Sequence, residues 1–243
     1  MSTLLLRLAA PLQSWGVESK FDIRQTGPAP SKSAVLGLLA CALGIRREDR
    51  AALEALRTLS FAVRIDQEGE LLRDYHGAKS YKTKDAFIRD RAFQDSYQTN
   101  RYYLSDAVFV AAVSSGDEAL IQRLDDALHS PAFPLYLGRR SCPPTLPVSL
   151  GVRPLSALEA LRAEPWHASE EYQQKWRSRH TAPQLRLLMD AVPGQASARI
   201  RDVPLSYDPS CRRYTFRNTA EVYMELDIDI TRHDAMAEVE ACT

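Results

Sequence analysis

The stretch "YYLSDAVFVAAVSSGDEALIQRLDDALHS" (Tyr102–Ser130) predicts a β-strand followed by an amphipathic helix. Its first part, Tyr102–Val113, is rich in aromatic and β-branched residues, which is typical of a buried strand. The segment 116–130 then has the apolar spacing of a helix that buries one face. The residues on that face are Leu120, Ile121, Leu124 and Leu128.

The residues before this stretch supply further elements. "TLLLRLAAP" (Thr3–Pro11) predicts a short strand that a proline ends. "PSKSAVLGLLACALGI" (Pro30–Ile45) predicts a helix with Ser31 as its N-cap. A second helical segment follows at 47–59, and "SFAVRIDQEGELLRDYHG" (Ser60–Gly77) predicts a β-hairpin.

The predicted order is β-α-(α)-β-β-α, and one more strand would complete a sheet. "FPLYLGRRSCPP" (Phe133–Pro144) supplies that strand or a loop. We therefore expect an α+β fold, a ferredoxin-like, RRM-like antiparallel sheet with helices on one face. After Pro147 the sequence changes to short strands and loops. This change divides the chain into an RRM-like domain at 1–146 and a small β-rich C-terminal lobe at 147–243.

Composition is that of a globular protein, and it points to neither metal nor cofactor. Lys plus Arg and Asp plus Glu each total 31, so net charge gives no sign of nucleic acid. The four cysteines are scattered without zinc-finger spacing, and we expect reduced thiols. The longest apolar run is too short to span a membrane. We expect a cytoplasmic protein with no metal, no cofactor and no membrane partner.

One segment has a local excess of positive charge. Between Arg73 and Arg101, basic residues are interleaved with tyrosines and phenylalanines. Basic groups hold phosphates and aromatic rings stack on bases, although a solvated hairpin would have the same composition. An insertion that projects from an RRM-like sheet is well placed to touch a bound strand. The RNA-binding candidates in this segment are Lys79, Lys82, Lys84, Arg89 and Arg91.

A second group of candidates lies in loops. Arg139 and Arg140 follow a glycine, and adjacent arginines suit phosphate or base recognition, or equally a salt-bridged surface loop. Trp15 is a candidate for stacking on a base, although a tryptophan beside a short strand is more often a core residue. Arg24, in the polar loop that follows Trp15, completes this group.

The start of the helix at "PSKS" allows two interpretations. Ser31 suits plain N-capping. The unpaired N–H groups of the first turn, together with Lys32 and Ser33, would also bind an anion. The GxxxxGKS pattern of a Walker loop is missing. We expect both, and Ser31, Lys32 and Ser33 are therefore RNA-binding candidates.

In this order, several segments resemble the Cas-five family of the RAMP superfamily, and within it the members from type I-E CRISPR Cascade. The similar stretches are an N-terminal strand, "PLQSWG", "RQTGPAPSKSAVLGLLACALGI", "YYLSDAVFVAAV", "PLYLGRRSCPP" and "DVPLSYDPSCRRYTFR". The resemblance implies an RRM-like fold with a protruding β-hairpin thumb, here an insertion at about 77–101.

The same resemblance implies a non-catalytic role in antiviral defence. A family member of this type would bind the 5′ handle of crRNA at one end of the Cascade complex. It would contact the CasC backbone subunits and the large CasA subunit. Target DNA would be reached only through the assembled complex.

The alternative is a metal-independent endoribonuclease that processes pre-crRNA at the repeat. Relatives in type I-C systems use a tyrosine, a lysine and a histidine, and such cleavage needs an acid and a base. In this chain only His76, beside Tyr75 and close to Lys79, is placed for such a site. A lone histidine at a hairpin end is more often structural, so we expect no catalysis. "DAVFVAAV" also lacks the RNP1 order of a general RNA-binding RRM.

Overall fold

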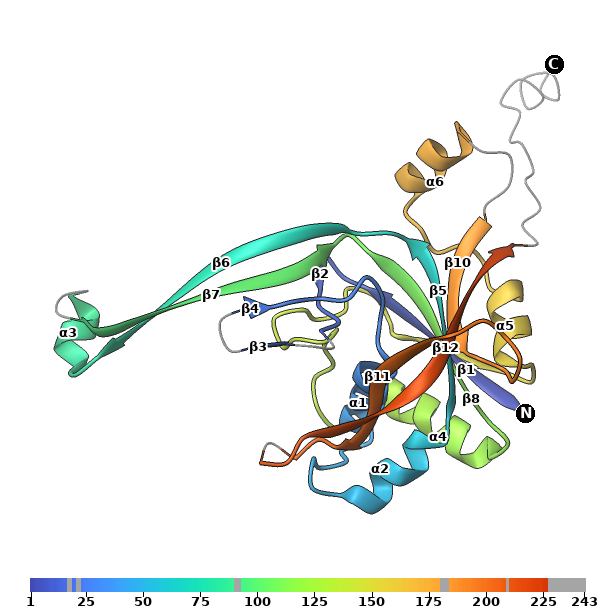
Figure 1. Ribbon diagram of the computed structural model, residues 1–243, viewed down its shortest axis with the longest axis horizontal. Helices are drawn as coiled ribbons and strands as arrows, with labels where there is room; N and C mark the ends of the chain where they lie inside the picture. Colours follow the sequence, from blue (N-terminus) through green and yellow to red (C-terminus); the bar gives the residue numbers. More distant parts are fainter. Residues whose placement is uncertain (17–18, 21–22, 90–92, 180–183, 209, 227–243) are drawn as a thin grey trace.

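The structure, a computed structural model, describes residues 1–226 except 17–18, 21–22, 90–92, 180–183 and 209. Within these residues the larger of two sheets has seven strands, in the order β11-β12-β10-β5-β8-β1-β9 (Figure 1). They are β1 (Ser2–Ala9), β5 (Ser60–Gln67), β8 (Val108–Ser115), β9 (Ser149–Arg153), β10 (Gln184–Asp190), β11 (Ala198–Ser206) and β12 (Arg213–Glu225).

Four strands of this sheet form the expected ferredoxin-like unit. The chain runs β1, α1 (Lys32–Ala42), β5, β8, α4 (Glu118–His129), β9, while the order across the sheet is β5-β8-β1-β9. All these strands pair antiparallel. The predicted α+β fold class is therefore confirmed. The fourth strand is β9, and Phe133–Pro144 forms the loop that the sequence left as one possibility.

The segment after residue 147 extends the same sheet. β9 pairs with β1, and β10 pairs with β5 on the opposite side. β12 and β11 follow as an antiparallel pair beyond β10. These strands therefore belong to the same continuous sheet as the N-terminal unit. The division into two domains at residue 146 stays a prediction.

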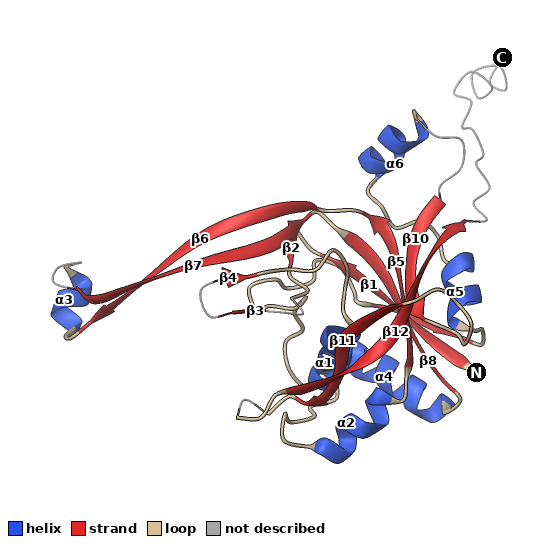
Figure 2. Cartoon of the chain, in the orientation of Figure 1, coloured by secondary structure: helices blue, strands red, loops and turns tan. Residues whose placement is uncertain are grey.

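The helices cover both faces of the sheet (Figure 2). α1, α2 (Arg50–Arg57) and α4 pack over Leu4, Leu6 and Leu8, which are fully buried. On the other face, α5 (Ala157–Ala163) and the segment before α6 (Glu170–Arg177) pack over Leu5. The alternation along β1 therefore separates two apolar clusters. Within the ferredoxin-like unit itself, both helices, α1 and α4, lie on the same face of the sheet. None of the helices in the described part of the chain is long and apolar enough to cross a membrane.

The second sheet supports a long projecting hairpin. β2 (Leu12–Gln13), β7 (Phe93–Ser105), β4 (Ile23–Arg24) and β3 (Ser19–Lys20) lie in this order, and β6 (Glu70–Tyr81) pairs with β7. The β6–β7 hairpin extends far from the body and carries α3 (Lys84–Ile88) at its tip (Figure 1). We call residues 70–105 the thumb. The protruding thumb is confirmed, and it is longer than the 77–101 expected.

Two strand predictions were wrong. β5 and β6 are consecutive but do not form a hairpin, because β5 is buried and pairs with β8 and β10, whereas the mostly exposed β6 pairs with β7. Tyr102–Val113 is not one strand, since β7 ends at Ser105 and β8 begins at Val108. Between them Asp106 has a φ of 55°, a left-handed conformation that Asp tolerates. The sharp turn sends the chain from the thumb back into the core.

Candidate nucleic-acid interface

The thumb presents different side chains on its two faces. Successive residues of a strand point to opposite sides, so Arg73, Tyr75 and Lys79 of β6 share one face. The Arg73 Nε atom donates a hydrogen bond to Oδ1 of Asn100 on β7, at 2.9 Å. Tyr75 is 59% exposed. This face therefore combines an exposed aromatic ring with cationic groups.

A hollow lies on this face toward the tip of the thumb. An added Cβ at Gly77 would meet no heavy atom within 4 Å, so the glycine leaves open space between its neighbours along the strand. The rings of Tyr81 and Phe87 meet edge to face, with centroids 5.5 Å apart, and Phe87 is 66% exposed. The hollow is lined by Tyr75, Gly77, Ala78, Lys79, Tyr81, Phe87, Ser96 and Gln98. Aromatic rings beside a lysine and an amide suit a base and its phosphate.

The other basic candidates of the thumb gather at its tip. Lys82 lies in the turn after β6, Lys84 is the first residue of α3, and Arg89 follows α3. All three side chains are exposed. Lys79 borders the hollow. Arg91 lies outside the described residues.

Arg139 and Arg24 meet at the base of the thumb. Nη2 of Arg139 donates a hydrogen bond to the carbonyl oxygen of Arg24 at 2.8 Å. Its guanidinium also lies 4.6 Å from the centroid of the Tyr103 ring, on β7. Arg139 therefore joins its loop to the second sheet, which is neither of the roles that the sequence suggested. The side chains of Arg24 and Arg140 are exposed and face no such constraint.

Gly138 fixes the path of this loop. Its φ is +84°, and a Cβ built on it would lie 1.7 Å from the carbonyl oxygen of Ser14. Any side chain at this position would collide with backbone, so the sequence needs glycine here. The close approach of the two backbone segments is what holds Arg139 over Tyr103.

Trp15 belongs to the core. It is 1% exposed, and its Nε1 donates a hydrogen bond to Oε1 of the buried Gln13 at 3.2 Å. Its backbone N–H donates to Oγ1 of Thr26 at 2.8 Å. The ring offers no face on which a base could stack, so base stacking by Trp15 is wrong and the core interpretation is correct.

The N-terminus of α1 is occupied from within the chain. Ser31 is the N-cap, and its Oγ accepts a hydrogen bond from the N–H of Ala34 at 3.3 Å. The N–H of Lys32 donates to Oδ2 of Asp202, on β11, at 2.9 Å. The Oγ of Ser33 lies 3.3 Å from that of Ser31. The carboxylate of Asp202 therefore takes the place that an RNA phosphate was expected to fill.

Lys32 is also committed to an internal ion pair. Its Nζ lies 3.4 Å from Oδ2 of Asp190, and the residue is 6% exposed. Arg217 bridges the two carboxylates, with Nη1 2.8 Å from Asp190 and Nε 2.7 Å from Asp202. These residues, Lys32, Asp190, Asp202 and Arg217, form a cluster that we call the charge cluster. Contact of the Lys32 side chain with RNA is therefore a wrong prediction, because burial and pairing keep it from the surface.

The pKa values in the charge cluster reflect burial and pairing in opposite ways. Burial lowers the pKa of Lys32 below its ordinary value, and the Asp190 carboxylate opposes this shift. Burial also disfavours the charge of Arg217, but its hydrogen bonds to Asp202 and the charges of both aspartates outweigh burial and raise its pKa. The cluster is a set of mutually compensated charges, which holds α1 against β10, β11 and β12.

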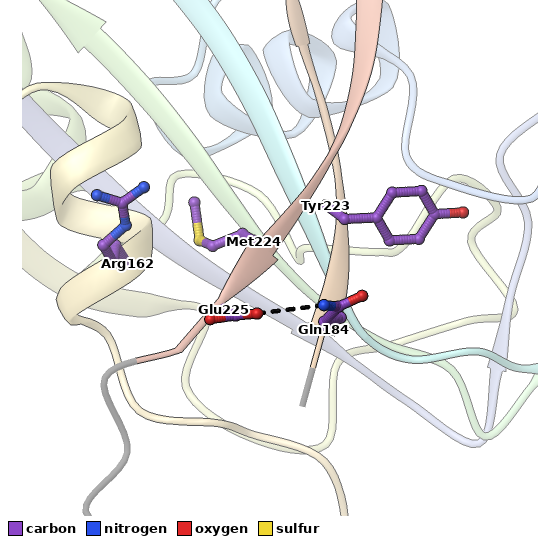
Figure 3. A pocket seen from close by; sticks show the side chains of 5 residues that line it. All are labelled: Arg162, Gln184, Tyr223, Met224 and Glu225. Carbon is purple, nitrogen blue, oxygen red and sulfur yellow. Dashed lines mark hydrogen bonds between the residues drawn. The ribbon is translucent and has the colours of Figure 1, made fainter. Parts of the chain in front are cut away.

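A second hollow lies where β10 begins and β12 ends, beside α5 (Figure 3). It is lined by Arg162, Gln184, Tyr223, Met224 and Glu225. Nε2 of Gln184 donates a hydrogen bond to Oε1 of Glu225 at 3.2 Å. With one cationic and one acidic lining residue, this hollow lacks the positive charge of the thumb.

The family of this chain is shown by a family model that matches nearly its whole length. A family model described as CRISPR-associated protein (Cas_Cas5) matches residues 3–219. The chain belongs to the Cas5 family of CRISPR-associated proteins. The resemblance inferred from the order of the sequence motifs is thereby confirmed.

A Cascade subunit and two solved structures of CRISPR proteins are similar to more than half of the chain. The CRISPR system Cascade subunit CasD of Escherichia coli (strain K12) is 40% identical over 161 residues, which are 62% of this chain and 70% of CasD. A chain from a structure titled CRISPR RNA-guided surveillance complex has a TM-score of 0.75 and 34% identity, with 92% of this chain and 90% of that chain covered. Another, titled Crystal structure of Cas protein, has a TM-score of 0.69 and 34% identity, covering 92% and 95%.

Several structural residues escaped the sequence analysis. Asp190, Asp202 and Arg217 were not singled out, although "DVPLSYDPSCRRYTFR" contains two of them. The strands that carry these three residues, β10, β11 and β12, also contain charged residues that are exposed or only partly buried, so nothing in the sequence indicated which charges are buried. The role of Gly138 had no signal in the sequence either, since its contact with Ser14 depends on the tertiary fold.

Proposed function

We propose that this chain is a non-catalytic subunit of a Cascade-type, CRISPR RNA-guided surveillance complex and binds the 5′ handle of crRNA with its thumb. The observation that carries the proposal is the long projecting hairpin with exposed basic and aromatic side chains, in a chain 40% identical to a Cascade CasD subunit. A hairpin of this length reaches beyond the body of the protein and can lie across a bound strand.

The distribution of charge along the thumb supports contact with a backbone. Lys82, Lys84 and Arg89 are exposed at the tip, and Lys79 lies beside the aromatic hollow. Phosphate contacts position a nucleic acid, and the aromatic rings supply surfaces for its bases. At the base of the thumb, the exposed Arg24 and Arg140 extend the cationic surface toward the body.

The geometry of the thumb argues against the ribonuclease alternative. Tyr75 and Lys79 lie on one face of β6, whereas His76 lies on the opposite face. A general acid and a general base must both reach the same phosphodiester, within about 3 Å of the atoms that exchange protons. One hairpin cannot bring His76 and Lys79 together in this way.

The partners follow from the same proposal. As part of such a complex, the chain would contact CasC backbone subunits and the large CasA subunit, and crRNA would guide the assembly to target DNA. We expect the assembly to act in the cytoplasm.

The test is a binding experiment with complexes assembled on crRNA. The thumb variant Lys82→Glu, Lys84→Glu, Arg89→Glu should lose at least about tenfold in crRNA retention, because each reversal removes a phosphate contact and adds repulsion. The control variant Lys175→Glu, Arg177→Glu, Arg179→Glu makes the same charge change at exposed positions near α6. A crRNA with a scrambled 5′ handle should also bind more weakly to the unmodified complex. Equal retention by thumb and control variants would overturn the proposal.

A further inference from the structure

Five exposed arginines lie at one corner of the body, apart from the thumb. They lie just before and at the start of α2 and after the turn between β11 and β12, and the sequence predicted no role for them. We call this set the arginine surface: Arg46, Arg47, Arg50, Arg212 and Arg213.

Two observations bring these segments together. α2 packs against β11. Hydrogen bonds from Ser210 lower the pKa of Asp208, in the turn after β11, and the charge of Arg50 lowers it further. The start of α2 therefore lies beside the β11–β12 turn, as Figure 1 also shows. Arg212 and Arg213 follow that turn directly.

The positive charge of this surface is not neutralised by ion pairs. Among the described residues, none of its five guanidinium groups forms a salt bridge. The nearby acids in the same segments are Glu48, Asp49 and Asp208. Oδ1 of Asp49 caps α2 by accepting from the N–H of Ala52 at 3.0 Å, and Oδ1 of Asp208 accepts from the N–H of Ser210 at 2.8 Å. Five positive groups against three negative ones leave a cationic corner on a chain of zero net charge.

The chemistry of the surface fits a phosphate backbone. Arginine presents a planar fork that can contact a phosphate with two hydrogen bonds. Arg46 and Arg47 are adjacent in the sequence, and so are Arg212 and Arg213. Arg199 lies on the opposite face of the sheet, where its guanidinium is 4.4 Å from the centroid of the Phe216 ring, and it is not part of this surface. Two pairs of adjacent arginines together with Arg50 can contact successive phosphates of a nucleic-acid strand.

The same surface lacks the apolar centre of a protein interface. Protein partners bury a core of aromatic and aliphatic side chains, with charges at the rim. Within residues 45–50 and 206–213, no large apolar side chain is strongly exposed among those described. An acidic protein partner is therefore the less favoured occupant.

We propose that the arginine surface binds the phosphate backbone of a nucleic acid, without sequence preference, at a site separate from the thumb. The site does not depend on the proposed contact between the thumb and the crRNA handle. It would give the protein a second contact, to a duplex or to another part of an RNA strand.

The test compares two labelled probes across a salt series. One is a mixed-sequence duplex DNA, and the other is a single-stranded RNA without any repeat sequence. The variant Arg46→Ala, Arg47→Ala, Arg212→Ala, Arg213→Ala should bind at least about tenfold more weakly. Its salt dependence should become shallower by up to about four units, roughly one for each lost phosphate contact. The same four positions changed to Lys should keep most of the affinity, because the charge remains.

Matched controls separate this site from general charge and from the thumb. The variant Arg162→Ala, Lys175→Ala, Arg177→Ala, Arg179→Ala removes four exposed cations on α5 and around α6, and it should bind both probes like the unmodified protein. Melting temperatures of all variants should agree, since the changed side chains are exposed. A loss confined to DNA or to RNA supports the site and identifies its ligand. Unchanged binding by the arginine-surface variant, an equal loss in the control, or a defect only in contact with protein subunits would overturn the proposal.

Discussion

The backbone N–H of Lys32 donates a hydrogen bond to the carboxylate of Asp202 at 2.9 Å, and this contact closes the N-terminus of α1. A helix N-terminus attracts anions because its first N–H groups are unpaired and its dipole is positive there. In this chain the anion is a side chain of β11. The local sequence indicated an anion site correctly, but its occupant belongs to the same molecule.

Asp202→Asn should therefore destabilise the protein by about 3 kcal/mol. The substitution removes a buried charge that Arg217 contacts, and a buried ion that loses its partner is costly. Asp190 still pairs with Arg217, which keeps the expected loss at the lower end of the range for buried pairs. Denaturant unfolding measures the change. Asp85→Asn, at an exposed position on the thumb, is the control and should shift stability by less than about 0.5 kcal/mol.

Lys32→Met should leave RNA binding unchanged. The Nζ of Lys32 faces Asp190 rather than solvent, and Arg217 continues to neutralise that aspartate. Removing one partner of a buried ion pair is costly, so stability should fall, but by no more than about 3 kcal/mol, because Arg217 still pairs with Asp190 and that aspartate is partly exposed. Titration with labelled crRNA and thermal melting test both parts. A clear drop in RNA affinity at unchanged stability would restore the phosphate-contact interpretation.

The lowered pKa of Lys32 also predicts a pH dependence. Burial brings this pKa below its ordinary value of 10.5. Between the lowered folded-state pKa and 10.5, the unfolded chain binds more protons at this residue than the folded chain does. Stability contributed by Lys32 should therefore rise with pH in that window. The difference in unfolding free energy between the unmodified protein and Lys32→Met isolates this contribution, and it should grow in favour of the lysine as pH approaches 10.5.

Local signals predicted much of this fold, and long-range contacts explain what they missed. The N-cap Ser31 and the apolar face of α4 depend on residues within a few positions, so the sequence located both helices. The partner of β6 could not be predicted in this way. The preceding strand, β5, does not pair with it, because β5 forms its hydrogen bonds with β8 and β10, which are far along the chain. Lys32 and Asp202 are 170 positions apart, and no local pattern connects them.

The same reasoning applies to the candidate site. The basic and aromatic composition of the thumb is visible in the sequence, and the exposed positions of Lys82, Lys84 and Arg89 agree with it. Whether a lone aromatic or arginine faces solvent depends on tertiary packing. For this reason Trp15 proved to be core and Arg139 proved to join two segments.

Gly138→Ala should destabilise the loop that carries Arg139 much more than the same change at Gly194. Both glycines have a positive φ, but a Cβ at Gly138 would overlap the carbonyl oxygen of Ser14, whereas one at Gly194 meets nothing within 4 Å. Gly194→Ala should cost only about 1–2 kcal/mol, which is the usual cost of a left-handed conformation for a residue other than glycine. Gly138→Ala adds a backbone collision to that cost. Equal losses in denaturant unfolding would mean that the two backbone segments separate freely.

Gly77→Val should weaken RNA binding without destabilising the thumb. The space above Gly77 is open, its φ is not in the left-handed region, and valine favours strands, so the substitution should keep or slightly raise the melting temperature. The added isopropyl group would fill part of the hollow between Tyr75 and Lys79. If a base or sugar of crRNA enters that hollow, affinity should fall at least about threefold, through the loss of a stacking contact worth about 1–3 kcal/mol in other proteins. Ser80→Val, three residues along the strand, places a valine side chain on the other face, outside the hollow, and should bind like the unmodified protein. If both variants bind crRNA equally well, the hollow lies outside the RNA interface and the thumb acts through its basic tip alone.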